Sequence, residues 1–231
     1  MIDKLAETIK LPKHSYLLDA GCGEGYTAIY LAQHYHYHVA GVDLLDFNIT
    51  SAKKKSQKEG VKEKVNFHIM NYEHLTYSDS TFDGVYTLET LVHAQNYIKA
   101  LREFHRILKP HGKIVLFEYT MAPQKLLTKQ QKEMATLVNK VSGMHSFSHF
   151  IHGSFPNIMK EAGFTTVSVT DITQEVLPGL KFFYYLAFLV YPIIKLLKLQ
   201  KIFINATCAV EAYKNVKDDI FRYVIVEAVK S

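Results

Sequence analysis

The feature that most constrains this chain is a glycine-rich turn near its N-terminus. Residues 16–25 read YLLDAGCGEG: a short apolar run, an acid, and then three glycines at alternate positions. Residues 26–32 follow with the apolar spacing of a helix. A strand, a glycine-rich turn and a helix form a cradle for a nucleotide, because glycine lets the backbone approach a ligand and the helix start offers free N–H groups. An ordinary strand-to-helix turn needs one glycine, so three predict a bound ligand.

The acid before the turn, Asp19, narrows the choice of ligand. A carboxylate at this point suits a cationic amine and would repel a pyrophosphate. The Gly-x-Gly-x-Gly spacing also departs from the G-x-G-x-x-G of dinucleotide-binding folds. Both observations count against a dehydrogenase that uses a dinucleotide, which remains a rival interpretation.

Composition indicates one domain over residues 1–231, because 231 residues that are 48% hydrophobic can bury a sizeable core. The net charge is +5, but the lysines are scattered and are not interleaved with aromatics on one face, so nucleic acid is not an expected partner. Cys22 and Cys208 are too far apart in sequence to suggest a disulfide framework. No apolar stretch follows Met1–Lys4 as in a signal peptide, and the two observations together predict a cytoplasmic location.

Apolar runs and helical patterns alternate along most of the chain, which predicts a parallel sheet with helices on both faces. Strands are expected at 16–18, 38–43, 65–70, 82–89, 114–119, 164–171 and 220–229, and helices at 1–13, 26–35, 49–60, 97–108, 124–141 and 155–162. The last two strands are separated by about 48 residues. Connections of this length usually have a function, so residues 172–219 are interpreted as a lid or substrate cap.

Polar residues follow the strands where a ligand would bind. Asp43 closes the second strand at the place where doubly wound folds put a ribose-binding carboxylate, although a helix cap is the alternative. Glu89 and His93 follow the fourth strand. Ligands of such sheets bind outside the carboxyl ends of the strands, at the topological switch point that the first and fourth strands flank. We therefore expect Glu89 and His93 beside the reacting groups, on one face if this segment is helical.

A second group of histidines has the spacing of metal ligands on a helix, at His145, His149 and His152. No carboxylate motif accompanies them, and the serines and glycines around them indicate a loop. The alternatives are a metal site and the lining of a substrate pocket, and no metal is assigned.

The run LDAGCGEG at residues 18–25 resembles the first motif of class I S-adenosylmethionine-dependent methyltransferases. The runs SDSTFDGVY at 78–86 and LKPHGK at 108–113, the Glu89–His93 segment and the pair Glu118–Tyr119 resemble the sterol C-methyltransferase branch and related small-molecule enzymes. The similarity covers about residues 15–170. It implies an α/β fold with a doubly wound, Rossmann-like sheet of seven strands, mostly parallel, with an antiparallel last strand and a helical lid inserted before it. It also implies methyl transfer from S-adenosyl-L-methionine, with S-adenosyl-L-homocysteine as product.

Cofactor contacts are expected around the glycine turn and at the strand ends: Asp19, Gly21, Cys22, Gly23, Gly25, Asp43, Leu44, Asn71, Tyr72 and Leu88. The family usually has an aspartate at position 71, which holds the adenine amino group. Asn71 keeps an acceptor oxygen there but lacks the charge. Tyr72 is expected either to flank the adenine ring or simply to pack.

Methyl transfer depends mainly on the alignment of the methyl donor with the acceptor, because the sulfonium methyl is already electrophilic and moves by in-line displacement. His93 is the expected base for an oxygen or nitrogen acceptor, with Glu89 orienting it or binding the cofactor. If the acceptor is an alkene carbon, as in the sterol enzymes, Glu89 would instead stabilise a carbocation. The alternative for His93 is a helix cap.

The apolar segment 182–194 gives an indication of the kind of acceptor. It is shorter than the roughly 20 residues that span a bilayer. It is interpreted as the packed side of a lid helix, as a wall for a lipophilic acceptor, or as an interfacial helix on anionic lipid through residues 181–201, flanked by Lys181, Lys195, Lys198 and Lys201. We therefore expect C-, O- or N-methylation of a small lipophilic acceptor. The alternative is a methyltransferase-fold cyclase or binding module that holds the cofactor without methyl transfer.

Overall fold

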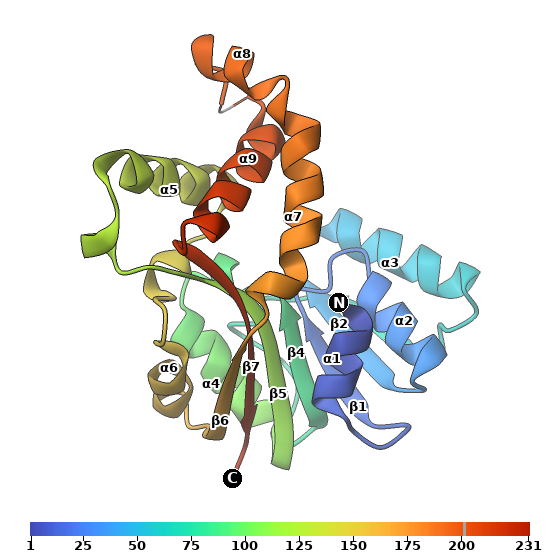
Figure 1. The fold of residues 1–231 in the computed structure, drawn as a ribbon. Helices are drawn as coiled ribbons and strands as arrows, with labels where there is room; N and C mark the ends of the chain where they lie inside the picture. Colours follow the sequence, from blue (N-terminus) through green and yellow to red (C-terminus); the bar gives the residue numbers. More distant parts are fainter. Residues whose placement is uncertain (201) are drawn as a thin grey trace.

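The computed structural model describes residues 1–200 and 202–231, so Lys201 lies outside the described residues. Its centre is a seven-stranded sheet in the order β3-β2-β1-β4-β5-β7-β6 (Figure 1). Strands β1 to β5 run parallel and β7 runs antiparallel to both of its neighbours, β5 and β6. The expected fold class is confirmed. The strands are β1 Tyr16–Ala20, β2 His38–Asp43, β3 Val65–Ile69, β4 Phe82–Leu88, β5 Leu108–Met121, β6 Thr165–Asp171 and β7 Phe221–Val229.

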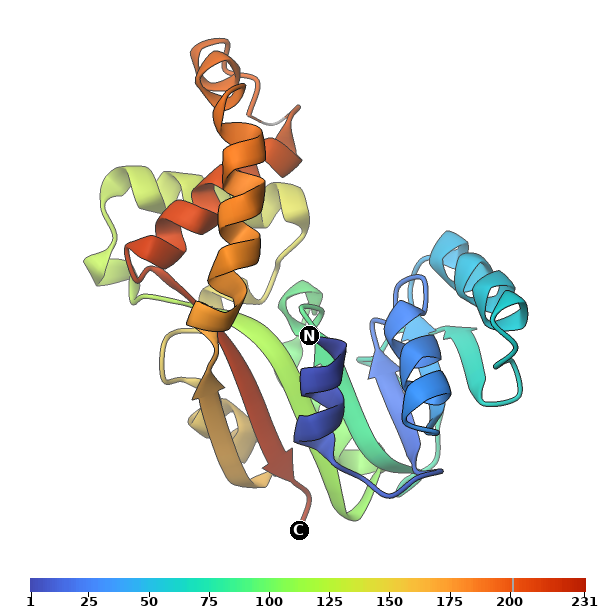
Figure 2. The same ribbon diagram turned by 45° about the vertical axis from the view of Figure 1, so that its right-hand side comes forward.

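Helices cover both faces of the sheet because successive strand residues point to opposite sides. Leu17 packs with one core cluster and Leu18 with the other. The first cluster includes residues of α1, α2 and α3, and the second includes residues of α4 and α6 (Figure 2). The helices are α1 Ile2–Ile9, α2 Tyr26–His34, α3 Asp46–Lys58, α4 Tyr97–Ile107, α5 Lys129–Ser142 and α6 Phe155–Glu161.

The helix expected over 124–141 begins later than its apolar pattern suggests. Residues Gln124–Leu126 form a separate 3₁₀ turn, and α5 starts only at Lys129. The reason is a capping box, in which the Thr128 hydroxyl accepts from the Gln131 N–H and the Gln131 side chain accepts from the Thr128 N–H.

The described part of residues 172–219 forms three helices beyond the carboxyl edge of the sheet, namely α7 Thr173–Phe188, α8 Tyr191–Leu196 and α9 Ile204–Lys217 (Figure 1). They have their own small apolar cluster, built on Ala187, Tyr191, Ile194 and Val210. The base of α7 is attached to β7, because the Ile172 N–H donates to the Tyr223 carbonyl over 2.9 Å. Within the described ranges, no helix is both long enough and apolar enough to cross a membrane.

Candidate active site

The glycine turn joins β1 to α2 in a conformation that only glycine adopts without strain. Gly21, Gly23 and Gly25 have φ of 86°, 51° and 77°. A Cβ on Gly21 would lie 2.6 Å from the Thr90 side chain, so this glycine allows the turn to touch the loop after β4. At Gly23 a Cβ would meet nothing within 4 Å. The backbone of Gly23 is therefore open to an approaching ligand.

Asp43, at the end of β2, holds this turn in place. Its Oδ2 accepts from the Gly23 N–H over 3.0 Å, and its Oδ1 accepts from the Leu45 N–H over 2.9 Å and from Asn48 Nδ2 over 3.2 Å. The carboxylate thus bridges the glycine turn and the segment that leads into α3, whose N-cap residue is Leu45 and has no side-chain cap. Each oxygen can accept more than one hydrogen bond, so the ribose role stays open as a prediction.

A cavity of about 390 Å³ lies over the carboxyl ends of β1, β2 and β4. Predicted cofactor residues and the predicted base contribute to its wall: Gly21, Asp43, Leu44, Asn71, Tyr72 and His93. Sequence reasoning missed the remaining lining residues, which are Leu45, Glu73, Thr90 and Gln95. Three of these residues directly follow a predicted site residue in the sequence: Leu45 follows Leu44, Glu73 follows Tyr72 and Thr90 follows Glu89. This adjacency is the sequence signal that could have identified them.

The other predicted cofactor residues do not line this cavity. Gly23 and Gly25 belong to the glycine turn, and Leu88 is partly buried and packs against the core cluster that contains Leu17. Cys22 is buried in the same core, and burial raises the pKa of its thiol, so it is a small protonated side chain. Their roles stay predictions.

The residues expected on the adenine side are linked to neighbouring segments by hydrogen bonds. Asn71 Oδ1 accepts from the Glu73 N–H over 2.8 Å, so one acceptor position of the amide is already used. The Glu73 carboxylate in turn accepts from the N–H groups of Gln95 and Asn96, over 2.7 and 3.2 Å. The Tyr72 hydroxyl donates to the Thr90 carbonyl over 2.8 Å. Tyr72 therefore has a packing role in the cavity wall, and contact with adenine remains its other possible role.

Asp19 is the most unusual carboxylate near the turn. It is only 4% exposed, and its Oδ2 has no hydrogen-bond partner among the described residues. Burial raises its pKa to about 7, and the neighbouring Tyr86 hydroxyl partly offsets this. A buried, incompletely paired carboxylate is stabilised by a nearby cation. Together with the open backbone at Gly23, it fits a ligand that has both a nucleoside and an amine.

The segment after β4 does not continue as an α-helix. Glu89 has φ 58° and the chain then forms a 3₁₀ turn over Leu91–His93, so the condition under which Glu89 and His93 would share one face of an α-helix is not met. The turn is held from below by Glu118, fully buried in β5, which accepts from the Leu91 N–H over 2.8 Å. Burial raises the pKa of Glu118 to about 8.

Glu89 and His93 nevertheless lie near one another. Glu89 Oε1 accepts from the Tyr223 hydroxyl over 2.8 Å. Burial raises the pKa of Glu89, and the hydrogen bond from Tyr223 and the charge of His93 oppose that rise. His93 Nδ1 lies 3.1 Å from the Gly143 carbonyl, which can only accept, so Nδ1 carries the proton and Nε2 is the basic nitrogen. Gly143 is the C-cap residue of α5. If His93 serves only as a helix cap, the helix that it caps is therefore α5.

A second cavity, of about 280 Å³, lies between the sheet edge, α5 and α9. Its wall is mostly apolar and includes Met134, Val138, Met144, Phe147 and Phe221. Polar groups enter from Glu89, His93, Tyr119, Ser142, Cys208, Glu211 and Asn215. His93 lines both cavities. The apolar segment 182–194, expected as a possible wall, contributes no residue to this cavity, because α5 and α9 lie in between.

The histidines of residues 145–152 have other surroundings. His152 Nδ1 is hydrogen-bonded to the Thr120 hydroxyl over 2.8 Å, and the His149 ring lies 5.2 Å from the Tyr97 ring. None of the three lines either cavity described above. Over residues 1–200 and 202–231, no group of three or more His, Cys, Asp or Glu side chains is arranged to hold a metal ion.

The strand order, the antiparallel β7, the glycine turn and the cavity above it define the class I S-adenosylmethionine-dependent methyltransferase fold. Residues 18–116 match the family described as "Methyltransferase domain". Over 231 residues, the chain is 32% identical to an S-adenosyl-L-methionine-dependent Diels-Alderase, iccD, of Talaromyces variabilis, covering 98% of this chain and 78% of that protein. It is 30% identical to phosphoethanolamine N-methyltransferase 1 of Zea mays, over 77% of this chain but only 34% of that protein.

Among solved structures, geranyl diphosphate C-methyltransferase from Streptomyces coelicolor A3(2), in complex with S-adenosyl-L-homocysteine, superposes with a TM-score of 0.76 at 15% identity. It is matched over 100% of this chain and 75% of that one. The protein described here belongs to the S-adenosyl-L-methionine-dependent methyltransferase family, and S-adenosyl-L-methionine is its cofactor.

Proposed function

We propose that the protein methylates a small lipophilic acceptor bound in the apolar cavity between the sheet edge, α5 and α9, and that His93 is the base. The observation that carries this proposal is the position of His93, which lines both the cavity over the glycine turn and the apolar cavity. Its Nδ1 is fixed by the Gly143 carbonyl, so Nε2 is the nitrogen that can accept a proton.

The residues of the chain have distinct tasks in this mechanism. The bound cofactor supplies an electrophilic methyl group, and the glycine turn, Asp43 and Asn71 would hold it over the sheet. The apolar wall excludes water and aligns the acceptor, which accounts for most of the rate. For an oxygen or nitrogen acceptor, His93 removes the proton, a contribution of about 10²–10⁴-fold. For an alkene acceptor, methyl addition leaves a carbocation, which Glu89, held in place by the Tyr223 hydroxyl, stabilises until a neighbouring carbon loses its proton to His93.

The proposal gives residues 172–219 the role of a substrate cap. Helix α9 contributes Cys208, Glu211, Ala212 and Asn215 to the wall of the apolar cavity. Without this helix the acceptor side of the cavity would open to solvent, which would weaken exclusion of water. The proposal also includes a peripheral membrane contact through residues 181–201, which suits an acceptor that partitions into lipid.

The test is a screen of lipid extracts with labelled S-adenosyl-L-methionine for a product about 14 Da heavier than its substrate, followed by His93→Ala. We expect turnover to fall by about 10²-fold or more, as for loss of a general base, and the Kd for S-adenosyl-L-homocysteine to change by less than about two-fold. His145→Ala is the matched control, because His145 is exposed and lines neither cavity. Full activity of His93→Ala would remove the base assignment.

A second candidate is a cyclisation that leaves the cofactor unconsumed. The observation that favours it is the 32% identity, over 98% of this chain, to a protein named as a Diels-Alderase. The apolar cavity would then fold a polyene so that its reacting carbons meet, with His93 and Glu89 as polar anchors. The same screen separates the two candidates: cyclisation gives an isomer of unchanged mass without S-adenosyl-L-homocysteine, and a binding module gives neither product.

A further inference from the structure

Helices α7 and α8 have two apolar faces, and only one of them is packed. Tyr184, Ala187, Tyr191 and Ile194 recur at helical spacing and pack with Val210 of α9. Other large apolar side chains of the same segment stay exposed. We call the surface formed by Phe182, Leu186, Leu189, Ile193, Leu196 and Leu197 the cap surface, with Leu189 at 78% and Leu196 at 81% exposure. A contiguous apolar surface of this kind indicates a binding partner.

The charged residues of the segment that bears the cap surface have one sign. Residues 176–210 contain four lysines and neither aspartate nor glutamate. Lys181, Lys195 and Lys198 are exposed, and none of them forms an ion pair with the residues that the structure describes. A second copy of this chain, docked by the same face, would bring lysines against lysines. The charge pattern therefore favours an anionic partner over self-association.

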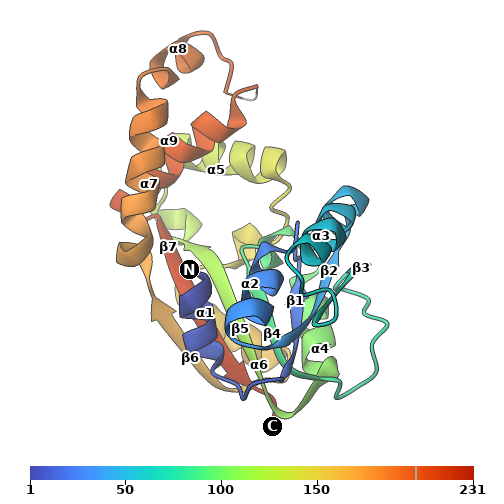
Figure 3. The same cartoon turned by 90° about the vertical axis from the view of Figure 1, so that its right-hand side faces the viewer.

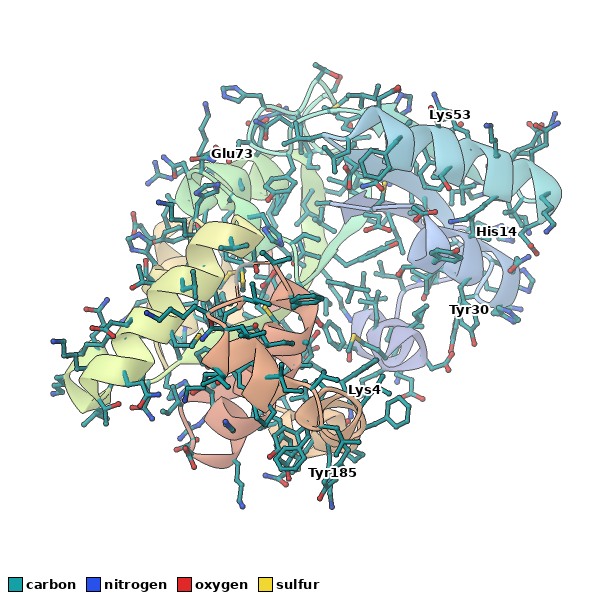
Figure 4. The ribbon with its side chains drawn as sticks, turned by 90° about the horizontal axis from the view of Figure 1, so that it is seen from above. Lys4, His14, Tyr30, Lys53, Glu73 and Tyr185 are labelled. Atoms are coloured by element: carbon teal, nitrogen blue, oxygen red, sulfur yellow. The ribbon has the colours of Figure 1, made fainter. Side chains whose placement is uncertain are left out.

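The cap surface also lies where a planar partner can reach it. Helix α8 is the element farthest from the sheet in all three side views (Figures 1, 2 and 3). From above, Tyr185 of α7 points outward at one edge of the molecule, while Lys53 of α3 lies at the opposite side (Figure 4). Helices that lie in a membrane interface combine aromatic and leucine side chains on one face with lysine side chains at headgroup level.

We propose that the cap surface docks on an anionic lipid bilayer, with its apolar side chains at the headgroup–acyl boundary and Lys181, Lys195 and Lys198 at headgroup level. The inference rests on the membrane contact in the proposed function, but it does not depend on methyl transfer.

Helix α9 connects this surface to the site. Ala206 and Ala209 line a hollow of about 270 Å³ together with Leu186. Cys208 and Ala212, on the same helix, line the apolar cavity proposed for the acceptor. A bilayer docked on the cap surface would therefore be separated from the acceptor by one helix. This proximity indicates that the acceptor is a molecule that partitions into the membrane.

The experiment is flotation of the full chain with vesicles of phosphatidylcholine alone, or of phosphatidylcholine and phosphatidylserine in equal parts, without any acceptor present. Each lysine near such a surface contributes about five-fold in partitioning, so Lys181→Gln/Lys195→Gln/Lys198→Gln should weaken binding on the order of 100-fold. The matched control is Lys53→Gln/Lys54→Gln/Lys58→Gln on exposed positions of α3, which should bind like the parent chain. Leu186→Ser/Leu189→Ser/Ile193→Ser should lose binding to both vesicles.

Retained S-adenosyl-L-homocysteine binding shows that each variant is folded. Equal binding to both kinds of vesicle, or equal loss in the α3 control, would overturn the anionic-lipid assignment. Dimerisation without vesicle binding would assign the cap surface to a second copy instead. If a methylated product forms but the protein does not bind vesicles, the membrane inference is wrong and the proposed reaction stands. If the protein binds vesicles but no product forms, the membrane inference stands and the proposed reaction is wrong.

Discussion

Replacing Asp19 by asparagine should make the cofactor-free protein more stable at alkaline pH. Asp19 is 4% exposed and one of its oxygens is unpaired within the described residues. Its pKa rises from 3.8 to about 7 because burial penalises the charged form. At about 1.4 kcal/mol per unit of pKa, this difference destabilises the ionised folded state by about 4 kcal/mol. Asparagine has nearly the same shape and no charge to desolvate.

The sign of the pH dependence follows from proton binding. Between pH 4 and pH 7 the folded protein holds a proton on Asp19 that the unfolded chain has released, so stability falls as the pH rises through this window. The parent chain and Asp19→Asn should therefore unfold at similar temperatures near pH 4. Above pH 7 the variant should unfold higher by about 8–16 °C, taking about 2–4 °C per kcal/mol for a chain of this size.

The assay is thermal unfolding of both proteins at several pH values between 4 and 8, with Asp218→Asn as an exposed control. Adding S-adenosyl-L-homocysteine should reverse the ranking, because the carboxylate compensates the cationic amine of the ligand and the amide does not. A difference in unfolding temperature that stays constant from pH 5 to pH 8 would refute the reasoning, since it would show that Asp19 is already ionised at pH 5.

Three further substitutions test the cofactor site. Asp43→Ala should weaken S-adenosyl-L-homocysteine binding at least several-fold by calorimetry, because the Gly23 N–H also loses its acceptor; unchanged affinity would remove the ribose assignment. Asn71→Asp should strengthen adenosine binding if position 71 holds the adenine amino group, and weaker binding would contradict that role. Gly21→Ala should lower the unfolding temperature by several degrees more than Gly60→Ala, because only the Gly21 Cβ would meet a neighbour, Thr90 at 2.6 Å.

The sheet and the strand-end residues could be predicted because their signals are local. Apolar runs ended by an acid or a glycine mark β1, β2 and β4, and topology then brings those ends to one edge of the sheet. Asp43 and Asn71 therefore appear in the cavity wall where the strand pattern puts them. Their hydrogen bonds did not follow from the sequence, since Asp43 bonds a glycine 20 positions earlier.

The conformation after β4 was beyond sequence reasoning because distant residues determine it. The Leu91 N–H bonds Glu118, 27 positions later, and the Gln95 N–H bonds Glu73, 22 positions earlier. These two buried carboxylates supply acceptors that a continued α-helix would not need. The spacing of Glu89 and His93 contains no trace of either partner, so the sequence left open whether this segment is helical, and the chain forms a 3₁₀ turn over Leu91–His93.

The apolar segment 182–194 shows the opposite problem, because its pattern supports several structures at once. A helix that is apolar all round has no marked inner face, so periodicity cannot choose between packing, substrate wall and interface. The structure divides these alternatives between the two faces: the one with Ala187 and Ile194 packs on α9, and the one with Leu189 and Ile193 stays exposed. The wall of the apolar cavity that we propose for the substrate comes instead from α5 and α9. An apolar face that is not needed for packing or for the acceptor costs solubility, which is the physical reason to expect a lipid surface against it.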